Sequence, residues 1–179
     1  MKIIASCFLY NKNMNKRQLF PKGTKAEFKI ENYLENNLDL IEPNLKLIKR
    51  QYKVYYKSTQ YMGAIDLFCQ GEDRAQVIVE LKSGELTARD LGQIMAYYAV
   101  CKIRSETHKL PHPRIYCIGL KLGPQYRMGL TLLNGGKDIN LKTYTYSITP
   151  GITFSDKEFI IELHNYNIEE EGTFKISSK

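Results

Sequence analysis

Two carboxylates and one lysine stand in stretches of this sequence that are otherwise apolar. Asp66 lies within the run IDLF, Glu80 follows the β-branched run VIV, and Lys82 comes two residues later. A buried carboxylate without a partner is unfavourable by several kcal/mol. The three positions therefore raise the question of what offsets this cost.

The spacing brings these side chains together if both stretches are strands of one hairpin. The five-residue segment GEDRA, which is typical of a turn, separates Gln70 from Gln76. Pairing these two residues places Asp66 directly opposite Glu80, with their Cβ atoms about 5 Å apart on one face. The two-residue period of a strand puts Lys82 on the same face. By the same period, four apolar neighbours are expected to point the other way, into the core: Ile65, Leu67, Val79 and Leu81.

Two carboxylates that face each other repel, so the hairpin predicts a cation between Asp66 and Glu80. Oxygen ligands with no histidine or cysteine nearby favour a hard ion such as Mg²⁺ or Mn²⁺. A second interpretation is structural, in which Asp66, Glu80 and Lys82 form a solvated ion-pair triplet on a half-exposed sheet. The pattern of residues leaves both interpretations open.

The rest of the sequence predicts the elements that position this hairpin. Thr24 and Glu27 have the T-x-x-E spacing of a capping box, and Thr87 is expected to cap a second helix. Apolar residues at helical spacing mark a core face, and β-branched and aromatic runs mark strands. The fold class is therefore α/β, a central sheet flanked by helices. The expected elements are a helix from Thr24 with Ile30, Leu34, Leu38 and Ile41 facing the core, strands at 45–56, 63–70 and 76–83, a helix at 87–104, a strand at 114–122, a short helix from Pro124, a turn at NGGK and a strand at 139–148.

The composition is that of an ordinary globular protein, with 43% hydrophobic and 25% charged residues. Apolar runs such as residues 3–10 are far too short for a membrane helix. Only six residues precede Cys7, too few for an export signal. The four cysteines show no CxxC spacing and are expected to be reduced, buried thiols. We therefore expect a cytoplasmic protein that contacts no membrane.

The net charge of +7 is distributed unevenly along the chain of 179 residues. Residues 1–30 and 101–149 each carry a net charge of +6, whereas residues 31–100 carry −2 and residues 150–179 carry −3. An acidic middle between two basic segments suits a cleft with basic walls and a metal-binding floor, which would hold a polyanion. The alternative is that the lysines only solvate the surface. We expect one domain over residues 1–179, with a core at about 24–149, a basic N-terminal lead at 1–23 and a C-terminal extension at 150–179.

Four motifs in series carry a resemblance to a known family. GAIDLF, VIVELKSG and DLGQIMAYY resemble the PD-(D/E)xK nuclease superfamily, and within it the catalytic domain of the NucS, or EndoMS, mismatch-endonuclease family. The segment IENYLENNLDLIEPNLKLIKRQY is similar to that family's first helix and strand, so the resemblance covers about residues 24–122. E-x-K alone is a weak motif, and the series is much stronger. The resemblance implies a restriction-endonuclease-like core with a mixed sheet and a Mg²⁺-dependent endodeoxyribonuclease.

The same resemblance implies roles for the hairpin residues. Asp66 and Glu80 would ligate Mg²⁺, for which Mn²⁺ would substitute, and the backbone carbonyl of Leu81 would be a further ligand. Lys82 would orient the attacking water or stabilise charge on the phosphorane. The metal would lower the pKa of a bound water and offset charge on the scissile phosphate.

Further roles follow for residues outside the hairpin. Gln93 and Tyr97, four apart on one helical face, match the family's helix residues that complete the site. Glu31 matches a helix glutamate near the metal, although Glu27 and Glu35 share its face. The DNA backbone would be held by basic residues of the strand at 45–56 and of the position that follows it: Lys49, Arg50, Lys53 and Lys57.

Several alternatives stay open at this level. The family usually has a separate N-terminal domain, whereas about 22 residues precede the first helix here, so the resemblance leaves mismatch specificity open. The DNA structure that is cut is open, and a structure-specific resolvase or an RNase fits the same motifs. A different class is a catalytically inactive protein that binds nucleic acid or another partner on a nuclease fold. Intact Asp66, Glu80, Lys82 and Gln93 argue against that class.

The C-terminal extension suggests a homodimer. Phe159, Ile160, Ile161 and Leu163 place too many apolar side chains in one strand for a solvated edge. Such a strand must be covered by the chain's own core or by a second copy. We expect the second copy, or a hairpin of the tail that packs on the core.

Overall fold

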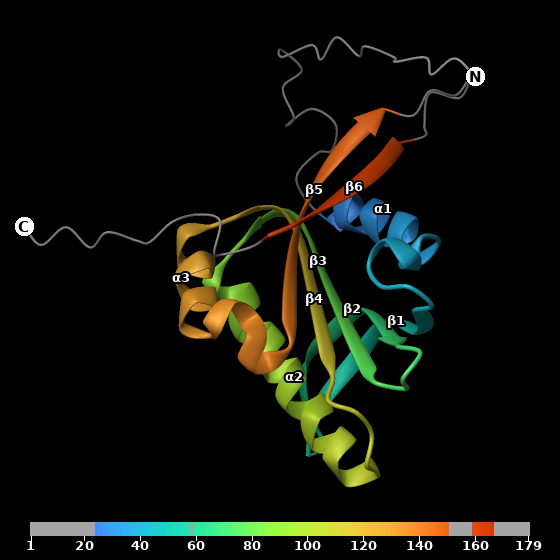
Figure 1. The fold of residues 1–179 in the computed structure, drawn as a ribbon, viewed down its shortest axis with the longest axis vertical. Helices are drawn as coiled ribbons and strands as arrows, with labels where there is room; N and C mark the ends of the chain where they lie inside the picture. Colours follow the sequence, from blue (N-terminus) through green and yellow to red (C-terminus); the bar gives the residue numbers. More distant parts are fainter. Residues whose placement is uncertain (1–23, 58, 151–158, 167–179) are drawn as a thin grey trace, which may run out of the picture.

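The computed structural model describes residues 24–57, 59–150 and 159–166, which form a six-stranded mixed sheet flanked by helices (Figure 1). The order of the strands in the sheet follows their order in the chain. The elements are α1 (Thr24–Glu35), the 3₁₀ helix η1 (Leu38–Leu40), β1 (Lys46–Tyr56), β2 (Gln60–Gln70), β3 (Gln76–Leu86), α2 (Ala88–His108), β4 (Arg114–Leu122), α3 (Pro124–Leu132), the 3₁₀ helix η2 (Asn134–Ile139), β5 (Leu141–Pro150) and β6 (Phe159–Asn165).

The direction of pairing divides the sheet into three parts. β1, β2 and β3 are antiparallel, β3, β4 and β5 are parallel, and β6 returns antiparallel to β5. Parallel neighbours need a crossover connection, which α2 supplies between β3 and β4, and α3 with η2 between β4 and β5. Residues 76–81 of β3 are all buried, as expected for a strand that is covered on both faces.

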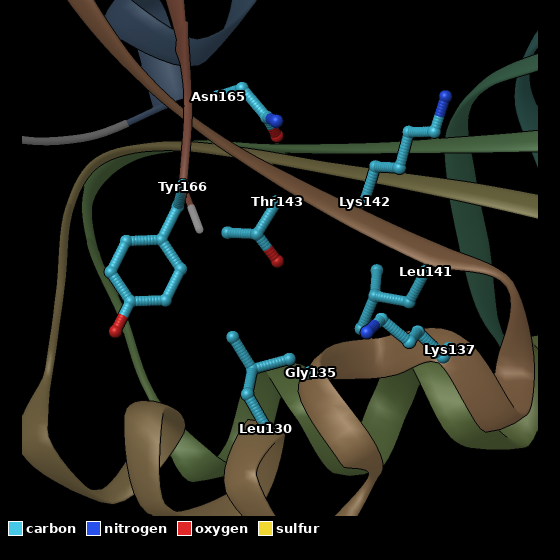
Figure 2. A pocket seen from close by; sticks show the side chains of 8 residues that line it. All are labelled: Leu130, Gly135, Lys137, Leu141, Lys142, Thr143, Asn165 and Tyr166. Carbon is cyan, nitrogen blue, oxygen red and sulfur yellow. The ribbon is translucent and has the colours of Figure 1, made fainter. Parts of the chain in front are cut away.

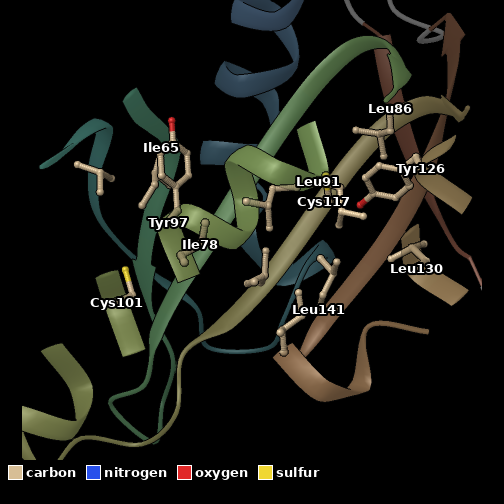
Figure 3. Packing of buried hydrophobic residues seen from close by; sticks show 14 of the residues in the cluster. Ile65, Ile78, Leu86, Leu91, Tyr97, Cys101, Cys117, Tyr126, Leu130 and Leu141 are labelled. Carbon is tan, nitrogen blue, oxygen red and sulfur yellow. The ribbon is translucent and has the colours of Figure 1, made fainter. Parts of the chain in front are cut away.

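One apolar core lies between the sheet and the helices α2 and α3 (Figure 3). Ile94 and Tyr97 of α2 and Tyr126 of α3 are buried there with Ile78 of β3 and Cys117 of β4. Burial of a large aliphatic or aromatic side chain contributes about 1.5–3 kcal/mol. This core therefore fixes α2 firmly against β2 and β3.

A second core lies on the opposite face, under α1. Ile30 and Leu34 of α1 are buried against Leu67 of β2 and Leu81 of β3. Ile30 and Leu34 confirm the expected core face, but the helix ends at Glu35, earlier than predicted. Ile41 lies beyond it and is buried in the same cluster, and Leu38 packs against that cluster. α1 is thus held over the end of the hairpin that carries the three charged residues.

Most of the expected elements are present at nearly the expected bounds. β4 covers residues 114–122 as predicted, β2 begins three residues earlier than predicted and β3 ends three residues later. Thr87 is the N-cap of α2, and the carboxylate of Asp90 accepts hydrogen bonds from its backbone N–H at 2.8 Å and its hydroxyl at 2.7 Å. The helix α1 begins at Thr24, whose side chain lies outside the described part of the chain.

The structure also bears on the predictions of buried, reduced cysteines and of a chain without a membrane helix. Cys69, Cys101 and Cys117 are free and buried, as expected, and Cys7 lies outside the described residues. Among the residues that the structure describes, no helix combines the length and the apolar character needed to span a bilayer.

One prediction for the hairpin is wrong. Leu67, Val79 and Leu81 share the core under α1, but Ile65 packs in the core under α2. The alternation of β2 breaks at Asp66, because β1 pairs with β2 at Arg50↔Leu67 and Tyr52↔Ile65 but not at the residues between them. The intervening residue of β1, Gln51, has a φ of +46°, which interrupts the extended strand.

The C-terminal strand is covered in part by the chain itself. Pairing of β6 with β5 places Ile161 in the core under α1, where it is 2% exposed, and Leu163 packs against the same core. The side chains of Phe159 and Ile160 lie outside the described part, as do residues 167–179. The argument for a dimer therefore rests on fewer apolar residues than the sequence suggested.

Candidate active site

The candidate site lies where β2 and β3 separate. The predicted register is confirmed for four pairs, from Gln70↔Gln76 to Leu67↔Val79, and the ladder ends there. At the next position the side chain of Asp66 replaces the backbone partner, since its Oδ2 accepts the N–H of Leu81 at 2.7 Å. The strands thus open around a carboxylate that is fixed by the backbone of the neighbouring strand.

Glu80 stands beside Asp66 with one oxygen unpaired. Glu80 is 1% exposed; Oε1 accepts a hydrogen bond from Lys82 Nζ at 2.7 Å, and Oε2 is a buried atom with no hydrogen-bond partner among the described residues. Burial and then the negative charge of Asp66 raise the pKa of Glu80 to about 8, although Lys82 acts in the opposite direction. An orphaned buried oxygen of this kind calls for a further ligand.

Lys82 is held between acidic groups. Its ammonium also contacts the backbone carbonyl of Leu81 at 3.1 Å. Burial by itself lowers the pKa of Lys82, but the carboxylates of Glu80, Asp66 and Glu27 together raise it above its ordinary value. The side chain is therefore positively charged at neutral pH.

The second oxygen of Asp66 faces β1 and α1. Oδ1 accepts a hydrogen bond from Gln51 Nε2 at 3.0 Å, and the same nitrogen lies 3.3 Å from each carboxylate oxygen of Glu31. Glu31 is buried, with 5% of its surface exposed. Burial raises the pKa of Asp66, against the hydrogen bond from Leu81, the charge of Lys82 and the hydrogen bond from Gln51. Three elements thus bring two carboxylates to one amide group.

Arg50 connects the same strand to α1. Its Nε donates to Glu31 at 3.0 Å, and one terminal nitrogen donates to Asn32 at 2.7 Å and to Glu35 at 2.8 Å. These hydrogen bonds and ion pairs raise its pKa. The guanidinium that the sequence assigned to DNA is therefore directed at the helix, where it orients Glu31.

The helix α2 reaches the site from the other face. Gln93 Nε2 donates to the hydroxyl of Tyr97, which donates to the carbonyl of Ala64 at 3.2 Å. Gly63 has a φ of +141°, and a side chain there would collide with the Tyr97 hydroxyl. The glycine of the G-x-I-D motif is thus needed because α2 packs too closely for a side chain at this position. Through this contact Tyr97 fixes the backbone two residues before Asp66.

A hollow of about 400 Å³ opens over the carboxylates. Its lining comes from α1, β1, β2 and β3. The lining residues are Glu27, Phe28, Glu31, Arg50, Gln51, Asp66 and Leu81.

A smaller cavity of about 170 Å³ lies between α3, η2 and β5 (Figure 2). Its lining contains no carboxylate. The hydroxyl of Thr143 there is within 3.2 Å of the Tyr126 hydroxyl, and the ammonium of Lys142 lies over the Tyr116 ring, 5.7 Å from its centroid. The first hollow, by contrast, is lined by the carboxylates of Glu27, Glu31 and Asp66.

The donor set at the first hollow fits a hard divalent ion. Among the described residues, no three carboxylate, thiol or imidazole groups form a closed metal site. Mg²⁺, however, is ordinarily held by one or two protein carboxylates and completes its octahedron with waters and substrate phosphates. The unpaired Oε2 of Glu80 is the observation that fits such an ion, and the other Glu80 oxygen and the carbonyl of Leu81 both contact Lys82 Nζ.

The basic side chains expected to hold DNA lie along the outer edge of the sheet. Lys49, Lys53 and Lys57 are exposed on and just after β1. Two exposed tyrosines pair across the same hairpin, with the rings of Tyr55 and Tyr61 5.6 Å apart. β1 thus leads from the hollow to a surface that is both basic and aromatic.

The site therefore gathers most of the residues that the sequence selected. Asp66, Glu80 and Lys82 meet at the fork, and Gln93 and Tyr97 contact the strand behind them. The three glutamates on α1 have different partners in the structure. Glu31 faces Asp66 through Gln51, Glu27 accepts the N–H of Ser83 at 3.3 Å, and Glu35 pairs with Arg50.

Gln51 is the residue that sequence reasoning missed. Gln51 is a polar residue between a basic neighbour, Arg50, and an aromatic neighbour, Tyr52, and nothing in that pattern marks it as part of a site. Its position opposite Asp66, once β1 is aligned with β2, is the only signal that could have indicated it.

Fold and site together define a mixed α/β protein in which two carboxylates and a lysine meet at a fork of the central sheet. Residues 8–109 match the endonuclease NucS C-terminal domain family, and the chain belongs to that family. A comparison with curated proteins gives no significant match.

Two solved structures are similar to this one. The EndoMS–dsDNA2 complex gives a TM-score of 0.50 with 19% identity over 68% of this chain and 44% of that chain. A repair endonuclease from Pyrococcus abyssi gives a TM-score of 0.49 with 20% identity over 68% of this chain and 46% of that chain. The first shows that the fold is shared. The matches cover 44% and 46% of those two chains, so this chain spans less than half the length of these relatives.

Proposed function

We propose that this protein is a metal-dependent endodeoxyribonuclease with a PD-(D/E)xK core. The observation that carries the proposal is the buried, unpaired Oε2 of Glu80, which lies beside Asp66 and on a carboxylate already paired with Lys82. If Asp66, Glu80 and Lys82 formed only a structural ion-pair triplet, each carboxylate oxygen would have a hydrogen-bond partner or would be exposed to water. The membership of the NucS family supports the same function.

Asp66, Glu80 and the carbonyl of Leu81 would hold Mg²⁺ or Mn²⁺, with Glu31 close enough to take part. When bound, the ion would lower the pKa of a coordinated water and offset negative charge on the phosphate. Burial keeps the carboxylates poorly solvated, which strengthens their attraction for a divalent ion. Glu80 must lose its proton to become a ligand, because its pKa is about 8 in the metal-free protein.

The other residues of the site act through charge and position. Lys82 stays protonated and would contact a phosphate oxygen or the attacking water as a point charge. Gln93 and Tyr97 fix the backbone at Ala64 and thereby the direction of Asp66. Arg50 holds Glu31 in the hollow, so it would act as a positioning residue.

DNA would approach along the outer edge of β1. Lys49, Lys53 and Lys57 would contact phosphates, which fixes the position of the backbone without reading sequence. The exposed rings of Tyr55 and Tyr61 add a surface on which bases can stack. The similarity to an EndoMS–dsDNA2 complex supports DNA as the substrate.

Cleavage assays test the proposal. Purified protein is incubated with plasmid, single-stranded, branched and mismatched DNA and with RNA, each with Mg²⁺ and with excess chelator. Glu80→Gln is compared with Glu85→Gln, a matched change on the same strand whose carboxylate pairs with Lys121. We expect cutting of DNA by the wild type and by Glu85→Gln, and none by Glu80→Gln.

Other outcomes separate the alternatives. Binding of DNA without cleavage under every condition would indicate an inactive binding protein. Cleavage of RNA alone would indicate an RNase, and cleavage confined to branched DNA a resolvase. Undiminished cutting in excess chelator would refute the metal mechanism.

A further inference from the structure

We propose that Gln51 is a positioning residue that takes the place of a cation between Asp66 and Glu31, and that a divalent ion must displace it to bind. The inference rests on the proposed metal-dependent function. It adds that the affinity for the ion is set by a side chain that is not itself a ligand.

The backbone directs Gln51 into the site. Consecutive residues of a strand point to opposite faces, yet Arg50 and Gln51 both contact Glu31. The φ of +46° at Gln51 produces this, since Tyr52 then returns to the core on the other face. A residue with a side chain in this region is held there against its own preference. The conformation serves the contact that Gln51 makes.

The amide group does what a cation would do. A single nitrogen donates toward one oxygen of Asp66 at 3.0 Å and both oxygens of Glu31 at 3.3 Å. It thereby reduces the repulsion of two poorly solvated carboxylates. The other oxygen of Asp66 accepts a hydrogen bond from the N–H of Leu81.

A divalent ion cannot share that position. Mg²⁺ lies about 2.0–2.1 Å from its oxygen ligands, well inside the distance that the amide keeps. An ion that ligates both Asp66 and Glu31 would lie between the two carboxylates, where the amide nitrogen of Gln51 now lies, so its binding requires the amide to withdraw. Hydrogen bonds to charged groups are among the stronger ones, so their loss opposes binding of the ion.

The alternative is that Gln51 has a purely structural role and only connects β1 to α1. Arg50 already makes that connection, through Glu31, Asn32 and Glu35. If Gln51 only connected β1 to α1, replacing it would not change the affinity of the protein for a metal ion. The two readings thus differ in a quantity that can be measured without any cleavage assay.

The test is titration of Mn²⁺ alone, without DNA, into the full chain, followed by calorimetry and by the shift in melting temperature. Gln51→Gly removes the amide and suits the positive φ. Gln51→Asn keeps a residue that tolerates this region and shortens its reach by one methylene. Gln60→Asn on exposed β2 is the matched control. We expect Mn²⁺ to bind both Gln51 variants about tenfold more tightly than wild type, and Gln60→Asn unchanged.

Equal or weaker binding of Mn²⁺ by both Gln51 variants would overturn the inference while leaving the proposed function intact. Absence of Mn²⁺ binding by the wild type would overturn both. If Gln51→Gly fails to fold, Gln51→Asn decides the matter by the same titration.

Discussion

Replacing Glu80 with glutamine should make the metal-free protein more stable at alkaline pH, although it removes a proposed ligand. Burial and the charge of Asp66 raise the pKa of Glu80 from an ordinary 4.5 to about 8. The unfolded chain releases the proton near pH 4.5 and the folded protein near pH 8. Stability associated with Glu80 is therefore present below pH 4.5 and is lost as the pH rises to 8.

The size of the effect follows from that window. One unit of pKa difference corresponds to about 1.4 kcal/mol, so between pH 6 and pH 8 the wild type loses roughly 2–3 kcal/mol through this group. Glutamine has a similar shape and carries no proton to lose. The difference in unfolding free energy between Glu80→Gln and wild type should thus grow by roughly that amount between pH 6 and pH 8.

Urea unfolding in excess chelator at pH 6, 7 and 8 measures this difference. Glu85→Gln is the control, because Glu85 pairs with Lys121 at the surface and should show no comparable trend. Adding Mn²⁺ should reverse the order, since only the wild type keeps both carboxylates. A gain for Glu80→Gln that is constant or shrinks toward pH 8 would show that Glu80 is ionised throughout, and the reasoning from burial would be wrong.

The remaining predictions concern cleavage, DNA and assembly. Lys82→Ala should reduce cleavage by orders of magnitude while DNA affinity, measured by fluorescence anisotropy, changes little; near wild-type activity would exclude Lys82 from the site. Alanine at Lys49, Lys53 and Lys57 together should weaken DNA binding alike for all sequences and flatten its salt dependence by up to about 3 units of slope, and an affinity independent of salt in the wild type would argue against phosphate contacts. Light scattering of the full chain at micromolar concentration should give a dimer mass if β6 is covered by a second copy, and a monomer mass would rule this out.

The site could be predicted from the sequence as far as local pattern reaches. A five-residue turn and the two-residue period of strands predicted the register that pairs residues 67–70 of β2 with 76–79 of β3, and Asp66, Glu80 and Lys82 follow at the end of that ladder. Helical spacing put Gln93 and Tyr97 on one face of α2. These predictions hold because each depends on neighbours within about one hairpin or one turn of helix.

Only the tertiary structure decided what surrounds those residues. Glu31 and Gln51 are twenty positions apart and meet because α1 packs across β1 and because one residue of β1 leaves the extended conformation. The same packing pairs Arg50 with Glu31 and leaves one oxygen of Glu80 buried without a partner among the described residues. Burial, charge and the resulting pKa are properties of all the elements packed around a group, so no local pattern of residues can specify them.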